Sequence, residues 1–346
     1  MDKTLSIILR LCIVLILLTS TGCRTRIVDR QQVAKDERIV IRFSHVVAEN
    51  TPKGLAAKKF AELVRERTNG YVEVQVFPES TLYKDGEELK ALRNGEVQIL
   101  APATSKLSEL SPEWQVLDLP YAFQNSSSFH AFIDGPAGLL LFEKLQSYGF
   151  LALAVWDNGF KQITNNKRPL IYPKDFRGLS FRVMPSSRLL IDQFNVFGGS
   201  AKPMPFSDVY RALKDGEVDG QENSISNIYT KEFSSLQRYL TLSNHGYLAY
   251  IVITNAQFWN SLPDWIKNVL QETMAEVELW EREKAKELNE EQLRIIRQQG
   301  RVEIHTLSEG ERQIWESAFE PLYSKLEKEV NPELIKYLRQ LKEKTD

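Results

Sequence analysis

Two basic residues interrupt stretches that otherwise have the composition of buried strands, and their chemistry is that of anion recognition. Lys161 follows the segment WDNGF (156–160), just past an expected strand end, and Arg182 lies between Phe181 and Val183 in GLSFRVMP. A buried or half-buried arginine must be paired. Its partner is either an internal Asp or Glu, or a ligand carboxylate, which the planar guanidinium grips with two parallel hydrogen bonds.

A third polar residue, Asn223 in DGQENSISN, also stands near an expected strand end. Its amide both donates and accepts hydrogen bonds, and ligand groups gather near strand ends in α/β proteins. An asparagine in such a place also commonly forms a turn. The three residues together indicate a site for a small carboxylate, with internal ion pairs and a turn as the alternatives.

Motifs of enzyme chemistry are absent from the sequence. It contains no G-x-S-x-G, G-x-G-x-x-G, P-loop or H-E-x-x-H pattern. The four histidines have no partner at metal-ligand spacing, and the carboxylates fall mostly in helical charge runs, so no acid–base pair stands out. We therefore predict neither an enzyme nor a cofactor or metal site; an extracellular hydrolase is the enzymatic alternative, which the missing nucleophile and metal motifs disfavour.

The elements that must position these residues alternate between strand and helix from residue 38 onward, which is typical of an α/β protein. Thr51 and Pro52 predict a helix start, and Asn69-Gly70 its end. The sequence predicts strands at 39–46, 71–77, 151–156, 180–184, 201–204 and 247–254, and helices at 85–93, 263–297, 308–329 and 332–344. The helix at 263–297 is longer than a typical globular helix, so it has the length to lie across two lobes.

Two segments of the chain are nearly the same: ALRNGEV (91–97) and ALKDGEV (212–218). Each has the pattern of a helix end, a glycine stop and the start of a strand. Any helix-to-strand turn favours such residues, but the similar position of the two copies favours two related α/β lobes. A length of 346 residues also suits two lobes around a shared cleft.

The first residues have the pattern of a secretion signal. Lys3 gives a short positive region, and the apolar run 5–18 is interrupted only by Ser6 and Arg10. The run is shorter than the roughly 20 apolar residues of a spanning helix. We therefore predict a signal peptide over residues 1–22, with an uncleaved membrane anchor as an alternative.

The small residues 20–22 (STG) lead into Cys23, an order that resembles a bacterial lipobox, in which the cysteine becomes the lipid-modified N-terminus. Ser20 stands where the lipobox usually has an aliphatic residue, so a simple secretory signal is the alternative. The polar residues 23–37 are expected to form a lipid-anchored tether. The only other cysteine is Cys12, so no disulfide is expected beyond residue 23.

Composition excludes one further class of partner. The formal net charge is −2, whereas a nucleic-acid-binding domain is normally basic. We therefore expect no nucleic-acid partner.

Several segments carry a resemblance to a known family. They are RFSHVVAENTPKG (42–54), LPYAF (119–123), WDNGFKQIT (156–164), DFRGLSFRV (175–183), PFSDVYRALKDGEVDGQEN (205–223), SNIYT (226–230) and LTLSNHGYL (240–248). In these segments the chain resembles the DctP-type, dicarboxylate-binding extracytoplasmic solute receptors of tripartite ATP-independent (TRAP) transporters. The resemblance implies a two-lobed fold like that of class II periplasmic binding proteins, with a long helix across both lobes. The expected lobes are 38–158 plus 249–288, and 159–248 plus 289–346.

The resemblance also assigns roles to individual residues. Arg182 matches the arginine that pairs with the ligand carboxylate, Lys161 the basic residue of NGxKQ, and Asn223 the asparagine of GxEN. Phe206 matches an aromatic residue that lines the cleft. In the first lobe, the stretches His45–Val46 and Ala103–Thr104–Ser105 align with ligand-facing positions. Where the family often has GTENPPSN this chain has GQENSISN, a difference that bears on fine substrate preference.

The implied function is the capture of a four-carbon dicarboxylate, such as succinate, malate or fumarate, for delivery to the permease subunits of a TRAP transporter. The protein would work outside the cytoplasm, anchored by lipid to the outer face of the cytoplasmic membrane. Two alternatives stay open: a receptor for another organic acid (a monocarboxylate, keto acid or acidic sugar), and a ligand-sensing partner of a sensor kinase.

Overall fold

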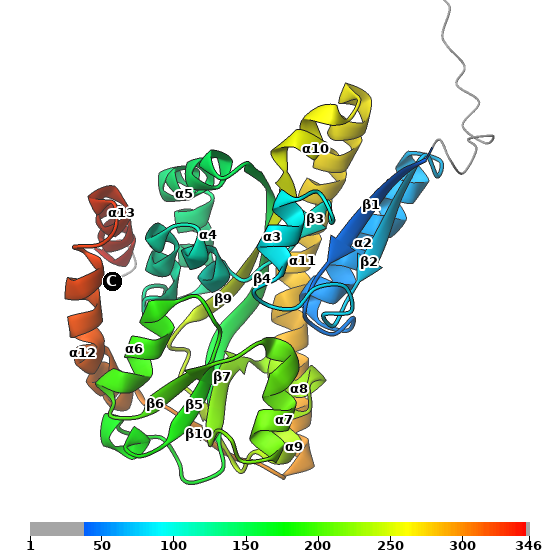
Figure 1. The fold of residues 1–346 in the computed structure, drawn as a ribbon. Coiled ribbons are helices and arrows are strands. Elements are labelled where there is room, and N and C mark those ends of the chain that lie inside the picture. Colours follow the sequence, from blue (N-terminus) through cyan, green and yellow to red (C-terminus); the bar gives the residue numbers. More distant parts are fainter. Residues whose placement is uncertain (1–37, 344–346) are drawn as a thin grey trace, which may run out of the picture.

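Strands and helices alternate in the computed structural model, which describes residues 38–343 (Figure 1). The strands are β1 (Ile39–Ser44), β2 (Val72–Phe77), β3 (Ile99–Leu100), β4 (Phe150–Asn165), β5 (Ser180–Val183), β6 (Ser200–Pro203), β7 (Gly220–Ser224), β8 (Tyr239–Leu242), β9 (Tyr247–Asn255) and β10 (Glu303–Thr306). The α-helices are α2 (Pro52–Arg67), α3 (Glu88–Arg93), α4 (Ser126–Ile133), α5 (Pro136–Ser147), α6 (Arg188–Val196), α7 (Val209–Lys214), α8 (Ile225–Thr230), α9 (Phe233–Leu236), α10 (Ala256–Ser261), α11 (Asp264–Gln299), α12 (Glu309–Leu326) and α13 (Pro332–Glu343). Short 3₁₀ turns follow β3 and β6 at Thr104–Glu109, Pro112–Asp118 and Phe206–Asp208, and a fourth lies at Pro173–Phe176.

The strand β4 links the two halves of the sheet, whose order is β2-β1-β3-β9-β4-β7-β5-β6. Its first part, up to Phe160, pairs antiparallel with β9. From Lys161 onward it pairs with β7, and from Ile163 also with β8. β4 and β9 therefore form the connection between a half built on β1–β3 and a half built on β5–β7 (Figure 1).

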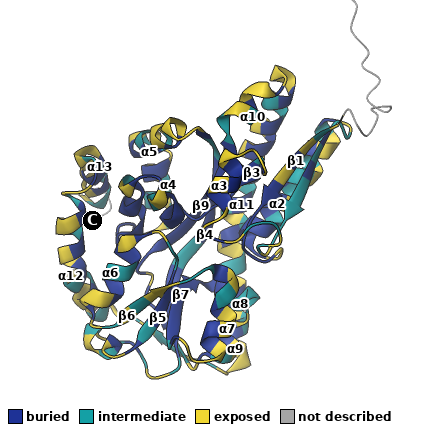
Figure 2. Cartoon of the chain, in the orientation of Figure 1, coloured by how far each residue is buried: buried dark blue, intermediate teal, exposed yellow. Residues whose placement is uncertain are grey.

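The strand β9 is buried on both faces, as its continuous apolar sequence LAYIVIT leads one to expect. Leu248 and Tyr250 belong to one cluster of buried apolar side chains, and Ala249 and Ile251 belong to another. Because successive side chains of a strand point to opposite faces, the two clusters form two core layers on either side of β9. Figure 2 shows the buried residues concentrated along these central strands.

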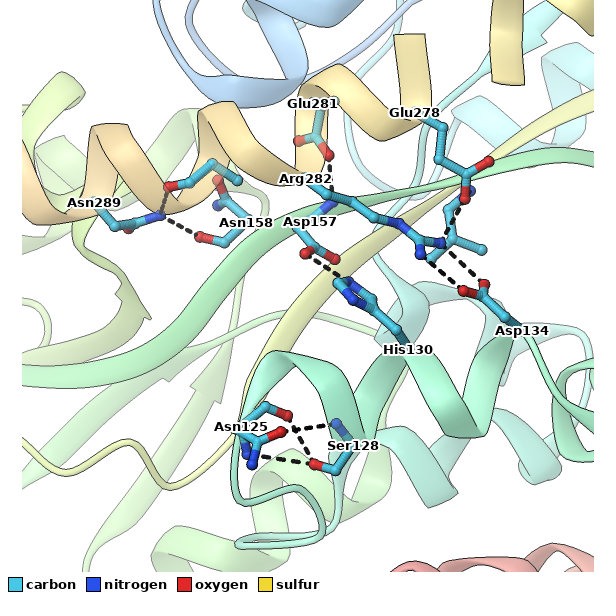
Figure 3. A network of polar contacts seen from close by, with 12 residues as sticks. Asn125, Ser128, His130, Asp134, Asp157, Asn158, Glu278, Glu281, Arg282 and Asn289 are labelled. Atoms are coloured by element: carbon cyan, nitrogen blue, oxygen red, sulfur yellow. Dashed lines mark hydrogen bonds and ion pairs between the residues drawn. The ribbon is translucent and has the colours of Figure 1, made fainter. Parts of the chain in front are cut away.

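The long helix α11 packs against α2, β4 and α8, so it contacts both halves of the fold. Polar side chains fix it to β4 (Figure 3). Glu281 Oε2 accepts a hydrogen bond from the backbone N–H of Asp157 at 2.7 Å, and Asn289 Nδ2 donates to the carbonyl oxygen of Asn158 at 2.9 Å. His130 of α4 contacts Asp157 Oδ2 at 2.8 Å. The helix is thus bonded to β4 at the point where the strand passes from one half to the other.

Most elements expected from the sequence are confirmed. Thr51 caps α2 by accepting a hydrogen bond from the N–H of Gly54, and α11 has 36 residues. Both copies of the repeated segment end a helix, α3 and α7, with a glycine in the left-handed region; φ is +74° at Gly95 and +71° at Gly216. Glycine adopts this conformation without the steric cost of a Cβ atom.

The last helix, α13, packs against α4 and α5, while α12 packs against α6. The C-terminal helices therefore contact elements of both expected lobes, and the exact division into 38–158 plus 249–288 and 159–248 plus 289–346 stays a prediction. Within the part of the chain that the structure describes, no helix is long and apolar enough to cross a membrane. The predicted signal peptide, Cys23 and the tether lie outside the described residues.

Candidate ligand site

A small cavity lies between the two halves of the fold. Its polar lining consists of Asp85, Lys106, Arg182, Asn223 and Asn227, and its apolar lining of Val46, Val47, Ala103, Met184, Phe206, Leu248 and Tyr250. The lining residues numbered 46–106 belong to the β1–β3 half, and those numbered 182–227 to the β5–β7 half. The last two lining residues, Leu248 and Tyr250, belong to β9. The cavity therefore has one wall from each half and a shared strand between them.

Arg182 of β5 is the expected carboxylate-binding residue, and the structure places it in this cavity. The side chain is 1% exposed. Its Nε and Nη2 atoms donate to the carbonyl oxygen of Met204 at 3.1 and 3.0 Å, and the guanidinium lies 5.7 Å from the centre of the Phe206 ring. Among residues 38–343, no carboxylate forms an ion pair with it.

Burial lowers the pKa of Arg182 to about 10, while the charges of Asp85 and Glu222 act in the opposite direction. The guanidinium therefore remains protonated at neutral pH. A buried cation that touches only neutral groups is costly, so an anion in the cavity would be stabilised by Arg182.

Lys161 has an internal partner instead. Its Nζ atom lies 2.9 Å from Glu222 Oε1 on the neighbouring strand β7. The other oxygen of Glu222 contacts Gln193 Nε2 at 3.0 Å and His245 Nε2 at 2.8 Å. Lys161 is not among the residues that line the cavity. The structure therefore does not bring the ammonium of Lys161 to the cavity beside Arg182, and a direct role in ligand binding stays a prediction.

Asn223 and Phe206 both line the cavity, as the resemblance implied. The Oδ1 atom of Asn223 accepts a hydrogen bond from Asn227 Nδ2 at 2.7 Å. Its own Nδ2 has no acceptor among the described residues. This leaves the amide N–H groups of Asn223 free to donate to a ligand.

Of the two stretches expected in the first half, Val46 and Ala103 line the cavity, while a ligand-binding role for His45 and Ser105 stays a prediction. His45 and Ser105 are buried but do not line the cavity; their neighbours Val46 and Lys106 do. Burial and the charge of Lys53 lower the pKa of His45 to about 3, so this imidazole is neutral. Ser105 Oγ donates to Asp118 Oδ1 at 2.5 Å. Both side chains are packed behind the cavity wall.

Sequence reasoning did not single out Lys106 and Asp85, which form part of the cavity wall. The Nζ atom of Lys106 is ion-paired with Asp85 and with Glu88, the latter at 2.9 Å. Burial raises the pKa of Asp85, but the adjacent Lys106 outweighs it and holds that pKa below its usual range. Burial raises the pKa of Glu88. Lys106 directly follows Ala103–Ser105, so its position in the chain was the available signal.

A further lysine, Lys53, lies behind the cavity. Its Nζ atom donates to the carbonyl oxygen of Ala101 at 2.9 Å and sits 3.6 Å from the centre of the Tyr250 ring. Burial, together with the charge of Lys106, lowers its pKa to about 7. The cavity is therefore lined by the cations Arg182 and Lys106 and by one carboxylate, Asp85, and Lys106 rather than Arg182 is ion-paired with that carboxylate.

Comparison with known proteins agrees with this chemistry. Residues 43–329 match the family model of the bacterial extracellular solute-binding proteins, family 7. The chain belongs to this family. Its members are solute-binding receptors and not enzymes, so the absence of enzyme motifs agrees with the family.

Two related receptors are similar over most of their length. The C4-dicarboxylate-binding protein DctB of Bacillus subtilis is 44% identical, over 93% of this chain and 92% of its own. The C4-dicarboxylate-binding periplasmic protein DctP of Rhodobacter capsulatus is 45% identical, over 86% of this chain and 90% of its own. The resemblance to DctP-type receptors is therefore confirmed.

Solved structures of TRAP periplasmic solute-binding proteins have the same fold. The protein from Sulfurospirillum deleyianum, with bound succinate, is 43% identical with a TM-score of 0.85, over 88% of this chain and 99% of that one. The protein from Shewanella oneidensis, also with bound succinate, is 40% identical with a TM-score of 0.86 over the same shares. The predicted two-lobed α/β fold is confirmed.

The Lys161–Glu222 pair predicts a specific dependence of stability on pH. Burial would raise the pKa of Glu222, but the charge of Lys161 and the hydrogen bond from His245 lower it to about 2. Its unfolded-state pKa is about 4.3. The carboxylate therefore stabilises the fold fully above about pH 4.3, by about 3 kcal/mol, and this is lost as the pH falls toward 2.

We expect Glu222→Gln to lower the free energy of unfolding at pH 7 by about 3–5 kcal/mol, because it leaves Lys161 buried without a countercharge. The difference from the native protein should shrink between pH 5 and pH 2. Urea unfolding across this range measures it. Glu333→Gln, which removes an exposed pair with Lys336, is the control and should have little effect at any pH. A difference that is constant with pH would contradict the assignment.

Proposed function

We propose that this receptor captures a four-carbon dicarboxylate outside the cytoplasm and delivers it to the membrane permease of a TRAP transporter. The observation that carries the proposal is the buried guanidinium of Arg182, which faces a cavity and has no carboxylate partner among the described residues. The names of relatives at 44 and 45% identity, and the succinate bound in structures at 43 and 40%, support the substrate class.

Two cations on opposite walls suit a ligand with two carboxylates. Arg182 belongs to the β5–β7 half, and Lys106 to the β1–β3 half. One carboxylate would take the free edge of the Arg182 guanidinium and a hydrogen bond from Asn223 Nδ2. The other would accept from Lys106, whose ammonium has three donors and two internal partners. Because each wall holds one end of the ligand, binding would draw the halves together.

The energies are sufficient for tight binding. Hydrogen bonds to charged groups contribute roughly 1.5–3 kcal/mol each. Four such bonds at the upper value give about 12 kcal/mol, and an association cost of about 4 kcal/mol then leaves about −8 kcal/mol, which corresponds to micromolar affinity. Closure excludes water and strengthens the same contacts by lowering the local dielectric constant.

Other organic acids are bound by more distant relatives. The sugar acid-binding protein of Advenella mimigardefordensis, in complex with galactonate, has a TM-score of 0.86 but is 30% identical. Because the succinate-bound structures are more similar in sequence at the same fold similarity, a four-carbon dicarboxylate is the better-supported ligand.

The first carboxylate contact is tested by Arg182→Ala and Arg182→Lys. We expect the alanine variant to lose dicarboxylate binding by at least 100-fold, since more than one charge-assisted hydrogen bond is removed. The lysine variant should also bind poorly, because a point charge cannot reproduce the two-pronged contact. Calorimetric titration with succinate measures both, with circular dichroism as the control for folding. Unchanged affinity in the alanine variant would contradict the proposal.

The preference for a dianion is tested by calorimetry on the native receptor. Succinate, malate and fumarate should bind at least tenfold more tightly than butyrate and pyruvate, a difference of about 1.4 kcal/mol. The reason is that a monoanion pairs with only one of Arg182 and Lys106. Equal or tighter binding of a monocarboxylate would leave the receptor function in place and overturn the substrate class.

We also propose that residues 1–22 are a cleaved signal peptide and that Cys23 carries lipid, which would anchor the receptor beside its permease. The proposal is supported by the apolar run and the Ser-Thr-Gly-Cys boundary. Mass spectrometry of native protein from a bacterial host should find a lipid-modified Cys23 at the N-terminus, and Cys23→Ser should abolish membrane retention. An unmodified cysteine, or residues 1–22 still attached, would contradict it.

A further inference from the structure

Asp85 makes a hydrogen bond across the cavity between the two halves. It lies between β2 and α3, is 8% exposed, and its Oδ2 atom accepts from the backbone N–H of Phe206 at 2.6 Å. Phe206 begins the 3₁₀ turn that follows β6 in the other half. Among the other contacts between the halves, Lys231 Nζ meets Glu79 Oε2 at 3.0 Å, but both of these side chains reach solvent. The hydrogen bond between Asp85 and the Phe206 N–H, in contrast, is buried and lies at the cavity.

The segment held by Asp85 is also the segment that holds Arg182. The Nε and Nη2 atoms of Arg182 both donate to the carbonyl oxygen of Met204, and the guanidinium lies beside the Phe206 ring. A shift of Met204–Phe206 would therefore move the guanidinium or remove its two hydrogen bonds. The carboxylate in one half consequently fixes the support of the ligand-binding cation in the other half.

Asp85 is itself held firmly. Its other carboxylate oxygen is ion-paired with Lys106, which Glu88 contacts from α3. Lys106 keeps Asp85 ionised despite its burial, and the positive charge of Arg182 acts in the same direction. The bond to the Phe206 N–H is therefore charge-assisted, and such bonds are roughly twice as strong as neutral ones.

We propose that Asp85 is a positioning residue that couples closure of the two halves to the ligand-binding geometry of Arg182. This role rests on the proposed receptor function, because only a receptor that closes around a ligand would use the Asp85–Phe206 bond in this way. Because this bond joins the two halves, it would stabilise their closed arrangement once a dicarboxylate has entered. It therefore slows the escape of a bound dicarboxylate and contributes little to the rate of its entry.

The test is stopped-flow measurement of succinate association and dissociation in the native receptor, Asp85→Asn and Asp85→Ala. For the alanine variant we expect a 10- to 100-fold faster dissociation, with the association rate constant within about threefold of native. The asparagine variant should fall between, because its amide oxygen still accepts the N–H but without the charge. Glu79→Gln, which removes the solvent-exposed pair between the same halves, is the matched control and should dissociate within about twofold of native.

The outcomes separate this inference from the proposed function. If the native receptor binds neither succinate nor malate nor fumarate, the proposed function fails. If it binds succinate and Asp85→Ala leaves the dissociation rate unchanged, the positioning role alone is overturned. Slower association with unchanged dissociation would also overturn it. Thermal unfolding of each ligand-free variant accompanies the kinetics, and a rate effect in Asp85→Asn at a native-like unfolding temperature would exclude a merely structural cause.

Discussion

The candidate site is organised around one buried charge, the guanidinium of Arg182. It is 1% exposed and touches a backbone carbonyl and an aromatic ring, with no carboxylate in ion-pair contact among the described residues. Removing a cation from water without a counter-ion costs several kcal/mol. In the proposed function, a bound carboxylate would recover this cost. On that proposal a loaded receptor would be more stable than an empty one, and this difference in free energy would favour closure of the two halves.

Lys161 is a second buried cation, but unlike Arg182 it has a carboxylate partner within the fold. It is as deeply buried as Arg182, but Glu222 of the neighbouring strand neutralises it, and Gln193 and His245 satisfy the remaining oxygen. The pair fixes β4 to β7 directly after the part of β4 that pairs with β9. One buried cation thus has an internal carboxylate partner, whereas the other has none among the described residues, although the two looked alike in the sequence.

Local sequence signals predicted much of the fold and part of the site. The caps of α2, the two glycine stops and the continuous apolar run of β9 act over a few residues, so they could be predicted without the tertiary structure. Arg182, Asn223 and Phe206, which the family resemblance singled out, line one cavity, and their role in ligand binding stays a proposal. The partner of Lys161 could not be predicted, because it depends on which strand lies beside β4 and in which register. Asp85 and Lys106 are 21 positions apart and meet only in the folded chain, so their pairing could not be predicted, and the sole local signal was the place of Lys106 directly after Ala103–Ser105.

In the proposed complex a ligand carboxylate neutralises Arg182 while a second carboxylate meets Lys106 on the opposite wall. A crystal structure of the receptor with bound succinate tests it most directly. We predict that one carboxylate lies within hydrogen-bond distance of the guanidinium, either through both of its oxygens or through one oxygen while the other accepts from Asn223. The second carboxylate should contact Lys106. Succinate held away from Arg182, or a dicarboxylate whose two ends both contact the β5–β7 half alone, would contradict this binding mode.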